Sequence, residues 1–334
     1  MSRALNAIGL GTAVVCALVV VLMSLGLPVS ESLGRLFQGS FGSGYAISNT
    51  LVKSTPLILT ALGVIVAWRA GMYSIGGEGQ FIIGGVCGAA IFKFGPQLPT
   101  SLLSVLILLM GIVGGALYSF IPGLLAVKRG IQVVISTILL NFIAIQVLGY
   151  VVTGPLKDPK SGLPMTSRLP DLAMLQRFDR QSDLHAGIFI AVAILSIVAV
   201  AYWLTPWGFR LRLVGDAPRV ARANRLPVDS EKLIAMAISG GLCGLAGAIE
   251  YVGLAGQLST GFTQNWGFLA IPVAILANLN PVGVALTAPL FGALFAGSDN
   301  LARFTKAGSA VVAIVQAVVV LGYLAVDAVR RNRE

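Results

Sequence analysis

A carboxylate and an amide lie close together within a long hydrophobic part of the sequence, and they are the residues best placed to do chemistry. Glu78 and Gln80 fall in the stretch 70–90, which reads AGMYSIGGEGQFIIGGVCGAA. An ionisable side chain at membrane depth is costly to bury, so it commonly marks a substrate or ion pathway. Alternatively, Glu78 accepts hydrogen bonds from the free N–H groups in the first turn of a helix. The sequence leaves both interpretations open.

The glycines of this stretch indicate how it folds. Six of them fall between Gly71 and Gly85, which is more than a helix needs for its own stability. In lipid, glycines let neighbouring backbones approach closely, and they let a helix break where it lines a cavity. A helix that begins at Gly77 would place Gln80 on one glycine stripe and Glu78 on the adjacent one.

Further polar and aromatic residues occur in other hydrophobic segments. Thr137 and Asn141 lie four residues apart, so they share one face of a helix. Polar side chains in membrane helices can line a path, but they also hold helices together, and a purely structural membrane subunit is therefore an alternative. The candidate path residues are Glu78, Gln80, Asn141, Gln146 and Trp266.

The composition defines the class of protein. Hydrophobic residues make up 56% of the 334 residues and charged residues only 11%, whereas soluble domains carry about 25% charged residues. The three cysteines lie far apart in apolar runs and there is a single histidine, so no metal site or redox centre is predicted. The net charge of +10 fits cytoplasmic loops better than nucleic-acid binding.

The hydrophobic runs predict an all-α, polytopic membrane protein with about ten spanning helices and a single transmembrane domain over residues 1–334. Arg3 before the first run and the arginines after the last favour two cytoplasmic termini. Residues 28–45 are expected to form a short external loop. The predicted spans are 7–27, 49–68, 70–90, 102–127, 131–152, 186–204, 233–252, 268–279, 282–295 and 310–328.

Two polar segments interrupt the hydrophobic runs. Residues 153–185 are rich in proline and mixed charges, which is typical of an ordered external loop. Residues 208–232 are predicted to be cytoplasmic and to contain a helix from Ala217 to Arg225, with Asp216 as its N-cap. A helix this short is unstable alone, so it must pack against the protein itself or against a partner. Its arginines could also serve only as a topology signal that contacts anionic lipid.

The sequence contains no G-x-x-x-x-G-K-[ST] motif, so a P-loop ATPase site is not expected in this chain. ATP-driven transport would therefore require a separate polypeptide. A stand-alone secondary transporter that uses Glu78 or Glu250 as an ion relay is the main alternative. A membrane-embedded enzyme is disfavoured, because carboxylates or histidines paired at helical spacing are lacking.

Four stretches resemble the permeases of ATP-binding-cassette (ABC) importers for nucleosides and related simple sugars. The run RAGMYSIGGEGQFIIGG is similar to the family pattern AG-x-x-NIG-x-EGQ, with Ser74 in place of the usual asparagine. Residues 154–158 (GPLKD) begin the external loop in the same way. The segment PWGFRLRLVGDAPRVARANRLPVD resembles the cytoplasmic coupling region, and residues 208–232 are therefore called the coupling segment below. Residues 261–291 resemble the second signature.

The resemblance covers most of the chain and departs from the family at Arg225 and at residues 276–278, where glycine is common. It implies a type II importer permease of the branched-chain and ribose-like superfamily in a bacterial plasma membrane. The implied partners are an ATPase subunit that binds ATP and Mg²⁺, a second permease subunit, equal or different, and an external substrate-binding lipoprotein. The residues implied in coupling to the ATPase are Gly215, Asp216, Arg219, Ala221, Arg222 and Ala223.

Overall fold

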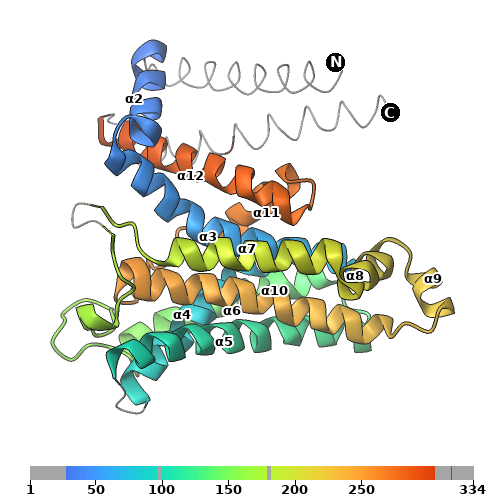
Figure 1. Cartoon of the computed structure of the whole chain (residues 1–334). Coiled ribbons are helices and arrows are strands. Elements are labelled where there is room, and N and C mark those ends of the chain that lie inside the picture. The colour runs from blue at the N-terminus through green and yellow to red at the C-terminus, as the bar shows by residue number, and fades with distance from the viewer. Residues whose placement is uncertain (1–27, 96–98, 179–181, 305–316, 318–334) are drawn as a thin grey trace. The chain divides into compact units, whose positions relative to one another are not determined.

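The computed structural model describes residues 28–95, 99–178, 182–304 and 317, and in them the chain is helical without β-strands (Figure 1). The α-helices are α2 (Val29–Phe41), α3 (Gly44–Arg69), α4 (Gly77–Phe94), α5 (Thr100–Arg129), α6 (Val133–Thr153), α7 (Gly187–Leu204), α8 (Pro206–Asp216), α9 (Pro218–Ala223), α10 (Val228–Glu250), α11 (Trp266–Leu276) and α12 (Pro281–Phe304). A 3-10 turn, η1 (Asp171–Ala173), and a π-helical turn, η2 (Tyr251–Ala255), complete the elements.

Six of the described helices are long and apolar enough to cross a membrane: α3, α5, α6, α7, α12, and α10 together with η2. The shorter helix α11 is also apolar. Each span predicted between residues 49 and 295 overlaps a helix, but the helices in 70–90 (α4) and 268–279 (α11) are not among the six. The predicted spans 7–27 and 310–328 lie outside the described residues. The chain is a multi-pass membrane protein, and its total number of spans stays a prediction.

The described residues fall into two compact units. The larger unit, Ser54–Ala288, is built on close packing of α10 against α4 and α5, and Figure 1 shows α5 running alongside α10. A methyl group added to Gly84 of α4 would lie 2.1 Å from the carbonyl oxygen of Gly244 in α10. Only glycine therefore permits this approach, as expected for membrane helices that associate through small residues.

The segment from Gly154 to Ala186 connects α6 to α7 and lies along the end of α10. Its backbone N–H groups at Thr166, Leu169 and Leu175 donate to carbonyl groups between residues 252 and 258, at 2.8–2.9 Å. His185 lies near the end of the segment and is 2% exposed. Its Nδ1 accepts a hydrogen bond from the N–H of Gly187 in the first turn of α7, at 3.1 Å. The side of the membrane on which this segment lies stays a prediction.

The smaller unit contains residues up to Lys53 and from Pro289 onward. The prediction of a loop over residues 28–45 is wrong, because Val29–Phe41 forms the helix α2. Its buried side chains are four residues apart, at Ser32, Leu36 and Ser40. Many serine and glycine residues in this stretch conceal the pattern in the sequence.

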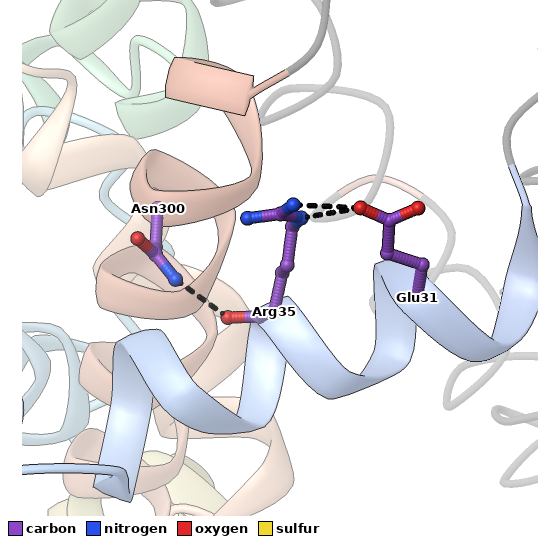
Figure 2. A network of polar contacts seen from close by, with 3 residues as sticks. All are labelled: Glu31, Arg35 and Asn300. Carbon is purple, nitrogen blue, oxygen red and sulfur yellow. Dashed lines mark hydrogen bonds and ion pairs between the residues drawn. The ribbon is translucent and has the colours of Figure 1, made fainter.

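Polar contacts join α2 and the start of α3 to α12 within the smaller unit. Figure 2 shows Asn300 of α12 donating to the backbone carbonyl of Arg35, at 2.9 Å, while the Arg35 guanidinium pairs with Glu31. Lys53 of α3 forms an ion pair with Asp299 of α12, with Nζ and Oδ2 2.7 Å apart. Charged side chains within hydrophobic helices are thus matched by partners in this unit.

Candidate functional site

The first turn of α4 is held by two polar side chains of α6. The first N–H groups of a helix lack acceptors within it. Asn141 Oδ1 accepts the N–H of Gly79, and its Nδ2 donates to the carbonyl of Ile75, both at 2.9 Å. Thr137 Oγ1 accepts the N–H of Ile75, at 3.1 Å, so the predicted common face of Thr137 and Asn141 is confirmed. Asn141 is 1% exposed, and both ends of its amide are used in fixing α4 to α6.

Glu78, in the first turn of α4, is directed at the start of a different helix. Its carboxylate accepts a hydrogen bond from the hydroxyl of Thr263 and another from the N–H of Gly267, the latter at 2.8 Å. Gly267 belongs to the first turn of α11, where a negative charge is favoured by the helix dipole. The helix-capping interpretation of Glu78 therefore describes the geometry, but the capped helix is α11, not α4.

Gln80 and Trp266 are buried in the first turns of α4 and α11. Trp266 is the first residue of α11 and is 1% exposed, while Gln80 is 2% exposed. Gln80 Oε1 accepts no hydrogen bond from the described residues. The predicted residues Glu78, Gln80, Asn141 and Trp266 thus gather where α4 and α11 begin. Among these four, Glu78 and Asn141 form the hydrogen bonds that join one helix to another.

Gln146 lies apart from that group. It is on the exposed side of α6, whereas Asn141 on the same helix is buried. With Phe142, Ile143, Val147 and Tyr150, Gln146 lines a groove of about 390 Å³. The other residues of the groove wall are apolar or aromatic. The side-chain amide of Gln146 is therefore exposed for contact with a ligand or a second chain.

The coupling segment folds against its own flanking helices. Val214 of α8, Ala221 of α9 and Val228 of α10 are buried together, with Leu213 and Leu226 packed against them. Arg210 of α8 pairs with the buried carboxylate of Glu231 in α10, with Nε and Oε1 3.2 Å apart. The short helix α9 thus receives the packing that it needs from the chain itself.

Two details of the sequence prediction for this segment are wrong. The helix spans Pro218–Ala223, which is shorter than 217–225, because Arg225 adopts a left-handed backbone with φ 60°. Asp216 ends α8 and does not cap α9, since the N-cap is Ala217 and no side-chain cap bond is formed. Of the residues implied in coupling, Arg219, Arg222 and Ala223 are exposed, Gly215 is partly buried and Ala221 is fully buried.

The sequence profile of the family described as "Branched-chain amino acid transport system / permease component" matches residues 46–324, which is most of the chain. The chain belongs to this family. It is the permease of a type II ABC importer, as the resemblance implied. The matched range includes both helix starts that meet at Glu78 and the whole coupling segment.

Named relatives of the permease carry different cargo. It is 32% identical to the guanosine ABC transporter permease protein NupP of Bacillus subtilis, over 90% of this chain and 87% of the relative. It is 29% identical to the glucose ABC transporter permease protein TsgB13 of Haloferax volcanii, over 94% and 85%. The probable riboflavin import permease protein RfuC of Treponema pallidum is 27% identical, over 83% and 74%.

Sequence reasoning missed three residues that organise this permease. Thr263 supplies a donor to Glu78, Arg69 binds the turn after α11, and Lys53 pairs with Asp299. Arg69 and Lys53 carried a usable signal, because each is a cation in or next to a hydrophobic run. Thr263 carried none, since its partner is 185 residues away. Among the described residues, no cluster of histidine, cysteine and acidic side chains is arranged to hold a metal ion.

Proposed function

We propose that the permease is the membrane subunit of an ATP-driven importer and that α9 is its docking helix for a separate ATPase subunit. The observation that carries this proposal is a short basic helix, α9, with one side packed against α8 and α10 and the other side exposed. Arg219 and Arg222 are exposed on α9, and Val220 between them is 50% exposed, while Ala221 faces the permease. An apolar side chain flanked by cations fits a groove with an acidic rim in a partner protein.

The two arginines on α9 provide the test. Arg222 lies 3.9 Å from Asp229 and both side chains are mostly exposed, so this pair contributes little to folding. The double reversal Arg219→Glu and Arg222→Glu adds repulsion to the loss of attraction, and we expect ATPase co-purification with a tagged permease to fall at least about tenfold. Retention of the ATPase, with substrate-stimulated ATP hydrolysis, would leave α9 as a topology signal in contact with lipid.

The matched control is the double reversal Lys160→Glu and Arg168→Glu. It makes the same change in charge, and both side chains are exposed in the segment between α6 and α7. ATPase association should be unchanged in this variant. The alternative of a stand-alone secondary transporter is tested with the permease alone in liposomes. Uptake driven by a proton or sodium gradient would exclude the importer proposal.

We propose that the cargo is a nucleoside or a simple sugar and that it passes along the exposed face of α6, between this permease and a second permease subunit. Phe142, Gln146 and Tyr150 are four residues apart, so they share one stripe of α6. A polar amide on a spanning helix is unfavourable against lipid, which favours a protein or aqueous neighbour. Aromatic rings beside a hydrogen-bonding amide suit a sugar or nucleobase ring.

The names of the relatives support the same class of cargo, because guanosine and glucose are both polyhydroxylated ring compounds. The test is a screen of nucleosides, nucleobases and sugars, with amino acids as the comparison set, by thermal shift of the external binding protein. Uptake is then measured in liposomes that contain the complete transporter. We expect at least one nucleoside or sugar to be bound and transported. Binding restricted to amino acids would refute the cargo assignment.

We also propose that the permease lies in a bacterial plasma membrane with both termini in the cytoplasm.

A further inference from the structure

The short helix α11 is bound at both of its ends by charged residues of the two helices, α3 and α4, that the seven-residue segment 70–76 connects. At its C-terminal end, Arg69 donates from Nε to the carbonyl of Leu279 and from Nη2 to that of Asn278, both at 3.0 Å. At its N-terminal end, Glu78 accepts the N–H of Gly267. One stretch of chain, from the end of α3 to the start of α4, therefore forms hydrogen bonds with both ends of α11.

The charges match the helix that they hold. A helix carries partial positive charge at its start and partial negative charge at its end, so an anion at the first and a cation at the second are stabilising. Asn278 and Leu279, which accept from Arg69, have left-handed backbones with φ of 52° and 51°. Asparagine tolerates this conformation but leucine does not, and Arg69 bonds the carbonyl groups of both residues. Arg69 thus fixes the turn between α11 and α12.

The coupling segment touches this same arginine through its backbone. A methyl group added to Gly215 of α8 would lie 2.1 Å from the carbonyl oxygen of Arg69 and 3.1 Å from the N atom of Gly71. No side chain intervenes, so a displacement of α8 toward α3 is not absorbed by rotamer changes. The guanidinium of Arg212 in α8 and that of Arg69 also lie over the same ring, Tyr202, at 4.9 and 5.8 Å from its centre.

A cavity of about 550 Å³ lies beside the coupling segment, between Arg222 of α9 and the turn that joins α5 to α6. Its wall includes Ile131, Gln132 and Val133 of that turn, and also residues 71–73 of the 70–76 segment. Open space therefore lies between α9 and the α5–α6 turn, whereas Gly215 of α8 lies directly against the backbone of Arg69.

We propose that Arg69 is a positioning residue that transmits movement of the coupling segment to α11, and through α11 and the 70–76 segment to the start of α4. The proposal depends on the proposed function, since it is the ATPase that would move α9. Because α9 is packed onto α8 by Val214 and Ala221, both helices move together and carry Gly215 against Arg69. Arg69 then moves the turn at Asn278 and Leu279 with it.

The first test separates coupling from assembly. The complete transporter is reconstituted with Arg69→Ala, Arg69→Lys or the control Arg177→Ala, whose arginine pairs with Asp183 outside the helices. The measured quantity is substrate transported per ATP hydrolysed. We expect Arg69→Ala to retain ATPase association and hydrolysis but to lower this ratio at least tenfold. Arg69→Lys should be intermediate, since a single ammonium nitrogen replaces the two guanidinium nitrogens that reach the two carbonyl groups. A merely structural role would lower the amount of complex and leave the ratio unchanged.

A second measurement tests the proposal even if the Arg69 variants fail to assemble, because it does not use them. Spin labels are placed on otherwise unchanged transporter at exposed positions: Phe209 of α8, Val282 after the α11 turn, and Ile131 in the α5–α6 turn. Between the nucleotide-free and ATP-bound states, the 209–282 distance should stay constant while the 209–131 distance changes. A change in the 209–282 distance, or no change in the 209–131 distance, would overturn the proposal. A normal transport ratio in Arg69→Ala would do the same, whereas loss of ATPase binding by the α9 double reversal would still support the proposed function.

Discussion

The contact between Glu78 and α11 yields a prediction that distinguishes the two interpretations of this carboxylate. Glu78 is 1% exposed and accepts from Thr263 and Gly267, so its replacement removes bonds from buried donors. Glu78→Leu keeps the approximate volume but leaves the N–H of Gly267 without an acceptor and removes the charge at the α11 dipole. Removing a buried charge is itself favourable and offsets part of this loss. The net effect should be a destabilisation of the permease by about 2–4 kcal/mol.

Glu78→Gln should cost less, about 1–2 kcal/mol, because the amide oxygen can still accept from Gly267 and the Thr263 hydroxyl can turn to accept from the amide nitrogen. The assay is thermal unfolding of the purified permease, together with uptake by the reconstituted transporter. Thr263→Val serves as the matched control, since it removes only the hydroxyl donor. We expect unfolding temperatures in the order parent, Gln variant, Leu variant, and uptake by the Gln variant close to that of the parent. A Gln variant of unchanged stability that transports nothing would refute this reasoning and place Glu78 in the transport path.

Two further predictions concern packing and pH. Gly244→Ala should destabilise the permease by about 1–3 kcal/mol, because its methyl group would overlap the carbonyl oxygen of Gly111, whereas Gly149→Ala, with open space around it, should not lower the unfolding temperature. Burial, aided by the charge of Arg177, lowers the pKa of His185 to about 4, so folding disfavours its protonated form. Stability is therefore complete above the unfolded pKa of about 6.5 and falls below it, by about 2 kcal/mol at pH 5. Unfolding temperatures of the parent and of His185→Asn, measured from pH 7.5 to 5, check this: the parent should lose stability and the variant should not.

The sequence by itself determined the class of protein and the position of its helices. Hydrophobic runs of sufficient length set the spans, so α3, α5, α6 and α7 begin and end close to the predicted residues. The glycines of residues 70–90 correctly indicated a helix that begins at Gly77 and packs closely on a neighbour. Four stretches that resemble ABC importer permeases indicated the family, and the absence of a P-loop motif placed ATP hydrolysis on a separate chain.

Tertiary structure decided which way each polar residue faces and what it contacts. In a soluble helix the apolar stripe marks the buried face, but a membrane helix is apolar on all sides and carries no such mark. Asn141 and Gln146 therefore look alike in the sequence, although one is buried against α4 and the other is exposed. Likewise, the partners of Glu78 and Arg69 lie about 200 residues further along the chain, and only the folded helices bring these charges to the two ends of α11.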